Sequence, residues 1–208
     1  MATLVLSTWV GVADTAAAAS SVPTETARRA TGALTADDRV KLARLGVANP
    51  TSAVVVVRHL ARSANGGELA RLRSLASAPA QLAPSGACDQ ILPRGEGQGY
   101  CAGHVSTAVG SAPARMPIAA SVVEGGPDTL QLVVRNSGPL EVKPLFSWST
   151  VVAPSRLVVA YELAPEPDGW RVTTRVGVEM LAHADSAKQI TDTLLKLDAW
   201  LTRDLMSR

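Results

Sequence analysis

The segment RLVVAYELAPEPDGWRVTTRVGVEM, residues 156–180, decides the fold of this chain. Apolar residues occupy every second position for most of its length, and polar or small residues fill most of the positions between them. Its centre, PEPDG at 165–169, is rich in turn-forming residues. Period-2 alternation on both sides of a turn is typical of an antiparallel hairpin with one apolar and one polar face. We therefore predict a half-buried hairpin that packs one face against a core.

Further strands are predicted on the N-terminal side of this hairpin. Runs rich in β-branched and apolar residues occur at 117–125, 129–138 and 145–153, separated by turns that contain Gly, Asn and Pro. Together with the hairpin they predict an antiparallel meander. The unbroken β-branched run at 52–60 indicates an additional strand that is buried on both faces.

A long amphipathic helix is predicted from about 186 to 205. Ser186 and Gln189 have the spacing of a capping box, and Asp192 and Lys196 have that of an i,i+4 ion pair. Steps of three and four residues place the apolar side chains on one stripe: Ile190, Leu194, Leu197, Leu201 and Leu205. The sequence therefore predicts the α+β class, with a twisted antiparallel sheet packed against this C-terminal helix.

Two shorter helices are predicted ahead of the meander, at 34–46 and 66–77. The first has Thr35 as a capping residue and Gly46 as its end, and its core-facing residues are expected to be Val40, Leu42 and Leu45. Residues 79–115 show no regular pattern.

The N-terminus resembles a secretory signal peptide. An apolar stretch is followed by small residues at 16–20, which offer A-x-A-type cleavage sites, although no Lys or Arg precedes Arg28. We expect residues 1–20 to be a signal peptide, 21–35 a linker and 36–208 a single α+β domain, secreted or periplasmic. No later apolar run approaches the roughly 18 residues that a transmembrane helix needs.

Composition argues against several classes of partner. The net charge is +2 and the basic residues are scattered, so neither nucleic acid nor an anionic membrane surface is an expected partner. The Gly-rich stretch at 95–99 lacks the lysine of a phosphate-binding loop, and no G-x-S-x-G elbow is present. We therefore predict no cofactor and no catalytic residue set, while a protein partner stays open. His59 borders an apolar strand and is expected to be a core or edge histidine.

Cys88 and Cys101 are the only cysteines, and they flank a loop with little to bury. In an exported chain the pair favours a disulfide. Two free buried thiols, a metal site that also uses His104, and a Cys101–His104 nucleophile stay open as alternatives. No metal is predicted, because a tetrahedral site needs a fourth ligand and Asp89 is the only candidate close by in the sequence.

Residues 116–206 resemble the START-like superfamily of polyketide cyclases and lipid-transport relatives, which has the helix-grip fold. The resemblance lies in the successive strands, in the line YELAPEPDGWRV within the hairpin, and in the long last helix. The chain departs from the family in lacking its usual start to the first helix and its larger helical insert. No catalytic residues are common to the family, so none are carried over.

The resemblance implies an apolar cavity between the sheet and the last helix. Its expected lining is Phe146, Trp148, Tyr161, Leu194, Leu197 and Leu201, although the aromatic residues can equally be simple core. The function expected is binding or carriage of a hydrophobic or lipid-like small molecule. A cyclase- or hydrolase-type enzyme and a protein-interaction module are the alternatives.

Overall fold

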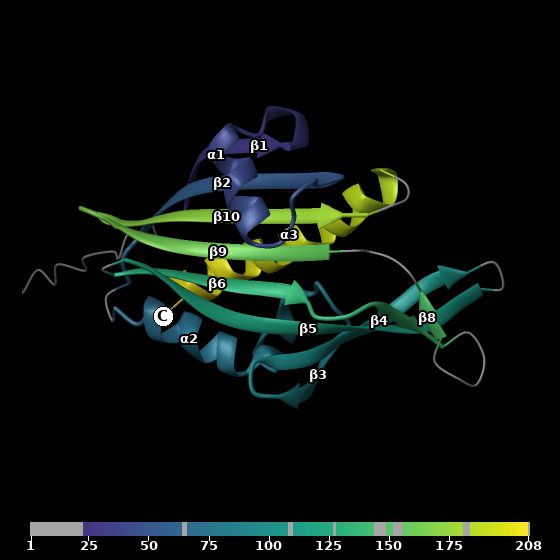
Figure 1. The fold of residues 1–208 in the computed structure, drawn as a ribbon. Helices are drawn as coiled ribbons and strands as arrows, with labels where there is room; N and C mark the ends of the chain where they lie inside the picture. Colours follow the sequence, from purple (N-terminus) through teal and green to yellow (C-terminus); the bar gives the residue numbers. More distant parts are fainter. Residues whose placement is uncertain are drawn as a thin grey trace, which may run out of the picture.

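The structure is a computed structural model, and it describes residues 23–63, 66–107, 110–126, 128–143, 149–151, 156–180 and 184–207. The predicted signal peptide lies outside these residues. Within them the fold is α+β, as predicted: antiparallel strands form one twisted sheet, and a long C-terminal helix packs across it (Figure 1). No helix of the described ranges combines the length and the apolar character needed to pass through a membrane.

Most strands that are neighbours in the sheet are also neighbours along the chain. The order is β1 (Thr24–Ala30), β2 (Ser52–Ala61), β10 (Gly169–Glu179), β9 (Arg156–Glu166), β6 (Thr129–Asn136), β5 (Gly110–Gly126), β4 (Gln98–Thr107) and β3 (Gln90–Gly95). Two short strands branch off this path, β7 (Leu140–Val142) beside β5 and β8 (Ser149–Val151) beside β7. Antiparallel pairing of β5 with β6, β6 with β9 and β9 with β10 confirms the predicted meander, apart from that branch, and β4 and β3 extend it beyond the predicted strands.

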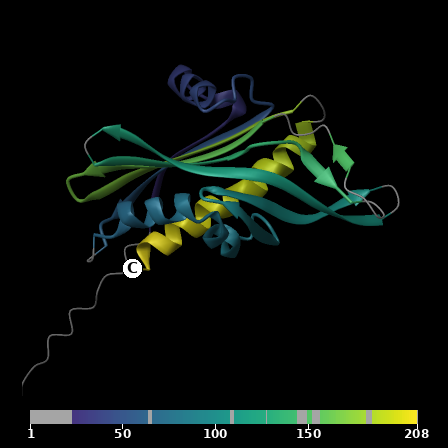
Figure 2. The same ribbon diagram turned by 60° about the horizontal axis from the view of Figure 1, so that its bottom comes forward.

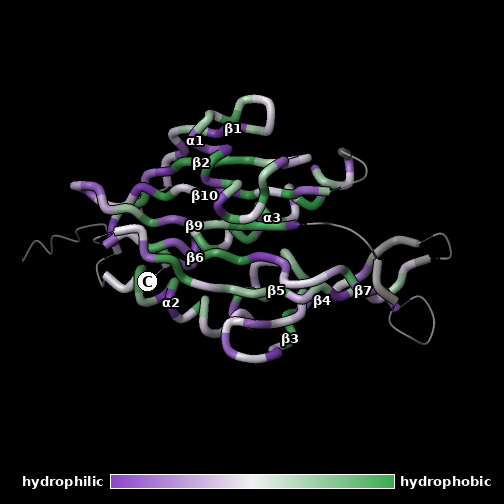
Figure 3. Tube along the Cα trace, viewed as in Figure 1, coloured by the Kyte–Doolittle hydropathy of each residue, from purple (hydrophilic) through white to green (hydrophobic). Residues whose placement is uncertain are grey.

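Helices cover both faces of the sheet. Figure 2 shows α1 (Ala36–Arg44) on one face, which we call the outer face, and α2 (Glu68–Ser77) with α3 (Ala184–Met206) on the opposite, inner face. Hydrophobic residues run along β2, β6 and β9 (Figure 3). The main core lies between the inner face, α2 and α3, and its fully buried members include Leu60, Leu72, Leu75, Leu132, Tyr161, Leu163, Val172, Leu201 and Leu205.

The predicted hairpin is confirmed as β9 and β10. Tyr161 lies opposite Thr174 and Leu163 lies opposite Val172, so the expected apolar positions share the inner face. A Cβ at Gly169 would lie 2.2 Å from the carbonyl oxygen of Leu60 on β2. Glycine is therefore required where β10 begins to pair with β2.

The prediction that the other face of this hairpin is polar surface is wrong. Val158 and Ala160 on that face are buried beneath α1, and so is Arg175. The cause is tertiary, because Leu42 of α1 and its neighbours pack on the outer face there and cover β9 and β10. Glu162 is 21% exposed and neutralises Arg175 through a 2.7 Å ion pair.

The first helix has the predicted start and end. Thr35 and Asp38 form a reciprocal capping box, and Gly46 follows the helix with a φ of +99°. Leu42 is buried as expected. Val40 is 47% exposed, so its predicted core position is wrong, since the helix turns that side toward solvent.

The last helix is confirmed, with Leu197, Leu201 and Leu205 buried and Ile190 and Leu194 partly buried. It begins at Ala184 in the described chain. Ser186 therefore lies in its first turn, and its predicted place before the helix as a cap is wrong.

Three segments differ from the predicted organisation. Residues 24–30, in the predicted linker, form edge strand β1, which is held by backbone pairing with β2. Residues 79–115 contain a 3-10 helix, η2 (Pro79–Ser85), and the β3–β4 hairpin. The run at 145–153 is not a central strand: β6 pairs directly with β9, because their apolar faces match, and the described part of that run is β8.

Candidate functional site

The two flanks of α3 meet the sheet in different ways. On the flank toward β2 and β10, the buried side chains of Thr174 and Asp198 meet the largely buried Arg58. Arg58 Nη1 donates to Asp198 Oδ1 at 2.8 Å and to Oδ2 at 2.7 Å, and the Thr174 hydroxyl donates to Oδ1 at 2.6 Å. We call Arg58, Thr174 and Asp198 the polar clasp. Each charged group in it is paired, so the clasp fastens α3 to the sheet.

The residues predicted to line a cavity are divided between the core and the undescribed part of the chain. Tyr161, Leu197 and Leu201 lie in the main core, and Leu194 is packed at its margin. Burial raises the pKa of Tyr161, whose hydroxyl lies 3.1 Å from Thr202 Oγ1. Phe146 and Trp148 lie outside the described residues. That this set lines a ligand cavity stays a prediction.

On its opposite flank α3 borders an open hollow of about 290 Å³, which we call the α3–β5 hollow. It lies between α3, strands β4, β5 and β7, and the loop that leads into β3. Its lining consists of Gly86, Ala87, Cys88, Asp89, Cys101, Ala102, Gly103, His104, Ala114, Met116, Leu140, Thr193 and Lys196. None of the residues of the polar clasp belongs to it.

Small residues create this space. Gly103 on β4 and Ala114 on β5 lie opposite each other in the sheet, and Gly86 and Ala87 contribute little side-chain volume from the loop. Met116 supplies a flexible apolar surface, since it packs at the margin of the main core. The hollow can therefore receive apolar atoms without displacing a core side chain.

The predicted disulfide is present and forms part of the wall. Cys88 and Cys101 are bonded, with Cα atoms 5.4 Å apart, and Cys101 lies opposite Met116 in the sheet. The bond ties the loop after η2 to β4. It also removes the thiols that the alternative metal and nucleophile interpretations require.

Charged groups lie at the rim of the hollow. His104 Nδ1 is 3.2 Å from Asp89 Oδ2, and both side chains are largely exposed. Lys196 projects from α3 and lines the hollow. The predicted ion pair between Asp192 and Lys196 is not found among the described residues, and Lys196 has no other hydrogen-bonding partner within them.

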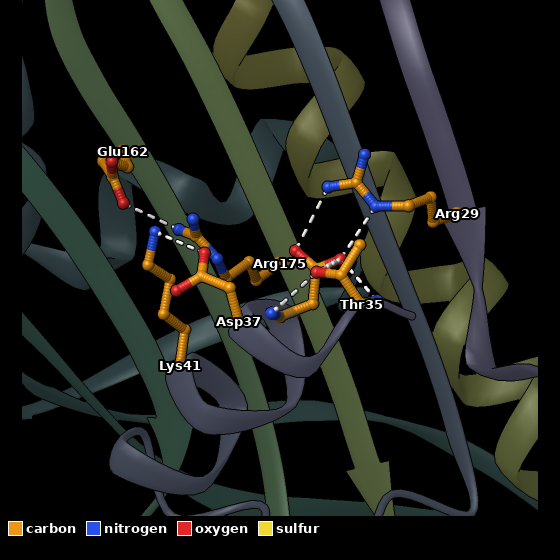
Figure 4. Close-up of polar contacts among 7 residues, drawn as sticks. Arg29, Thr35, Asp37, Lys41, Glu162 and Arg175 are labelled. Carbon is orange, nitrogen blue, oxygen red and sulfur yellow. Dashed lines mark hydrogen bonds and ion pairs between the residues drawn. The ribbon is translucent and has the colours of Figure 1, made fainter. Parts of the chain in front are cut away.

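A second polar cluster lies under α1 on the outer face (Figure 4). Arg29 Nε donates to Asp38 Oδ2 at 2.7 Å, and the Thr35 backbone and hydroxyl donate to the same carboxylate. Burial alone would raise the pKa of Asp38, but these hydrogen bonds outweigh it and hold that pKa at about 2. Asp38 is almost fully buried and its carboxylate is occupied by these partners, so the cluster fastens α1 to β1.

A second groove and the His59–Glu166 contact are weaker candidates for a functional site. A groove of about 550 Å³ separates the end of α2 from β5, but an Arg73–Glu124 ion pair of 3.3 Å crosses its rim. His59 lies at partial exposure, 3.0 Å from Glu166. In the described part of the chain, no three His, Cys, Asp or Glu residues are grouped so as to hold a metal ion.

Sequence reasoning identified the disulfide of the hollow but missed Gly103, Met116, Leu140 and Thr193. Glycine and alanine in a strand carry no signal of a cavity, because the space depends on which strands are paired. The sequence pattern predicts only a surface ion pair for Lys196. Only the tertiary placement of α3 beside β4 and β5 gives these residues a common site.

The sequence matches no model of a known protein family and no curated protein. Similar solved structures include a STAR-related lipid transfer protein from Xanthomonas axonopodis, with a TM-score of 0.45 and 16% identity over 74% of this chain and 85% of that one. An uncharacterised protein from Rhizobium leguminosarum has a TM-score of 0.38 and 20% identity over 73% and 94%. A protein from Arthrobacter aurescens has a TM-score of 0.40 and 12% identity over 75% and 87%.

Likeness at this level assigns neither a ligand nor an activity to the chain. The chain's own geometry, an antiparallel sheet crossed on its inner face by the C-terminal helix, has the helix-grip-like form that the START-like resemblance of residues 116–206 implies.

Proposed function

We propose that the protein binds a small, largely apolar molecule in the α3–β5 hollow. The observation that carries the proposal is an open space of about 290 Å³ walled by Met116, Leu140, Ala114 and the disulfide, directly beside the C-terminal helix. Its size is just below the range of roughly 300–1,000 Å³ that small-molecule sites occupy, so only a small ligand fits. Apolar walls with a few polar groups at the rim suit a ligand that is mostly hydrocarbon.

Binding or carriage is favoured over catalysis by the state of the reactive groups. The cysteines are bonded to each other, and the buried carboxylate of Asp198 is occupied by Arg58 and Thr174. A cyclase- or hydrolase-type activity is the second candidate, and one observation favours it. The contact of His104 with Asp89 at the rim is the arrangement that orients a general base.

We also propose that the protein acts outside the cytoplasm after cleavage of a signal peptide. The apolar N-terminal stretch and the small residues at 16–20 support this, and so does the disulfide, because such bonds persist in oxidising compartments. N-terminal sequencing of the protein from its native host should find a start between about Ala16 and Ser21. An intact Met1 or Ala2 would contradict export.

The binding site is tested by filling the hollow. Gly103 lies in a strand, outside the left-handed φ region, and an added Cβ would meet only the exposed Asp89 carboxylate, at 3.3 Å. Gly103→Val should therefore fold normally and occupy part of the space. Gly95→Val is the matched control, since it adds the same side chain to a strand glycine with open space around it.

The readout is the ligand that accompanies the protein. Native mass spectrometry of the purified full chain should show a lipid-like adduct on wild type and on Gly95→Val, and a reduced adduct on Gly103→Val. Equal adducts on all three proteins would place the ligand elsewhere. Absence of any adduct, together with no saturable uptake of 1-octanol, would contradict the proposed function.

A further inference from the structure

Two donor groups on α3 face the α3–β5 hollow without a partner in the described chain. Thr193 and Lys196 are three residues apart, so they lie on the same side of the helix, and both line the hollow. Asp192 lies one turn before Lys196 and offers an ion pair that helices commonly form, yet no such pair is found among the described residues. The Lys196 ammonium and the Thr193 hydroxyl therefore lie beside the apolar wall of the hollow.

The acidic group of the hollow is already engaged. Asp89 lies within 3.2 Å of His104 at the opposite rim, so its carboxylate has a nearby donor. No ion pair joins Lys196 to Asp89 or to any other carboxylate of the described residues. A ligand that complements this site places a negative group at Lys196 and an apolar group against the wall.

We propose that the ligand is a small amphipathic carboxylate. Its carboxylate accepts hydrogen bonds from Lys196 Nζ and Thr193 Oγ1, and its hydrocarbon lies against Met116, Leu140 and the disulfide. This inference rests on the proposed function, because it names the class of molecule that the hollow takes. Charge-assisted hydrogen bonds to a carboxylate are stronger than those to a neutral group, so the anion is preferred over its uncharged analogue.

The preference is modest because Lys196 is exposed. Water and salt screen an ion pair in such a position, so we expect octanoate to bind about two- to fivefold more tightly than 1-octanol at low ionic strength. The preference for octanoate should become smaller as salt is added, whereas the affinity for 1-octanol should not fall. Octylamine should bind more weakly than octanoate, since its ammonium would meet Lys196.

The test measures binding of octanoate, 1-octanol and octylamine to the full chain by calorimetry or NMR titration. Lys196→Gln removes the charge and should abolish the preference for octanoate over 1-octanol. Lys188→Gln is the matched control, because Lys188 is an exposed lysine of the same helix that does not line the hollow. It should behave as wild type.

The outcomes separate this inference from the proposed function. If 1-octanol binds and Gly103→Val blocks it, but Lys196→Gln retains the octanoate preference or wild type has none, the carboxylate inference is overturned and the hollow remains the site. A preference for octylamine overturns it equally. If none of the three probes binds, both the inference and the proposed function fail.

Discussion

The two flanks of α3 differ in what joins them to the sheet. Toward β2 and β10, the polar clasp joins helix and sheet through hydrogen bonds of 2.6–2.8 Å to one buried carboxylate. Toward β4 and β5, the helix borders a hollow lined by small residues, a disulfide and Lys196. A rigid attachment on one side allows an open space on the other, because the helix does not depend on the open flank for its position.

The largest expected effect comes from breaking the clasp. Asp198→Ala leaves the Arg58 guanidinium largely buried without its main counterion, and this should lower the free energy of unfolding by about 3–5 kcal/mol. Lys196→Ala on the open flank should lower it by less than about 0.5 kcal/mol. Urea denaturation of the two variants measures the difference. Equal losses would mean that the flanks contribute alike.

The next largest loss of stability is expected from shortening the leucine side chains of α3 that lie between the two flanks. Leu201 is fully buried, so Leu201→Ala should cost about 2–5 kcal/mol in unfolding free energy through lost contacts and a residual cavity. Leu194 is only partly buried, and Leu194→Ala should cost about half as much. Denaturation by guanidinium ranks the two. A smaller loss at Leu201 would show that the helix packs loosely there.

The next prediction concerns the disulfide, which forms part of the wall on the open flank of α3. Replacing both Cys88 and Cys101 by Ala should lower the free energy of unfolding by about 3 kcal/mol on the chain-entropy estimate, since the bond closes a loop of 13 residues. The loop that walls the hollow would then be free, so uptake of 1-octanol should weaken as well. A reducing agent should destabilise wild type and leave the double variant unaffected. Unchanged binding in the variant would show that the wall is not needed.

The smallest effect concerns the outer face, where α1 is held by its own charged cluster. The pKa of Asp38 is about 2, below its ordinary value of 3.8, so its hydrogen bonds stabilise the folded chain at neutral pH. This contribution, about 2 kcal/mol, is lost as the pH falls from about 4 through 2. Asp38→Asn should therefore be destabilised at pH 7 and approach wild type near pH 2. Urea denaturation at several pH values tests this, and a difference independent of pH would contradict it.

The elements with a strong local pattern were predictable from the sequence. The hairpin at 156–180 alternates with period 2, and α3 has its leucines at helical spacing, so each carries its structure in its own residues. Strand β1 could not be predicted in this way. Its sequence, TETARRA, has no apolar alternation, and it is a strand because the edge of β2 offers backbone partners.

The site was less predictable than the fold, because it depends on contacts between distant segments. The presence of just two cysteines predicts the disulfide. No local sequence pattern shows that Gly103 on β4, Met116 on β5 and Lys196 on α3 line the same hollow. The same holds for the buried face of β9 and β10. A polar position such as Arg175 reads as solvent-exposed until α1 is placed over it.

The central claim is that the open flank of α3, and not the clasped one, takes a small apolar ligand. A titration of the full chain with 1-octanol, followed by backbone amide NMR, tests it most directly. The account predicts saturable shifts at Gly103, Met116 and Thr193, with Arg58, Thr174 and Asp198 unaffected. Saturable shifts confined to the clasp, or none anywhere in the chain, would contradict it.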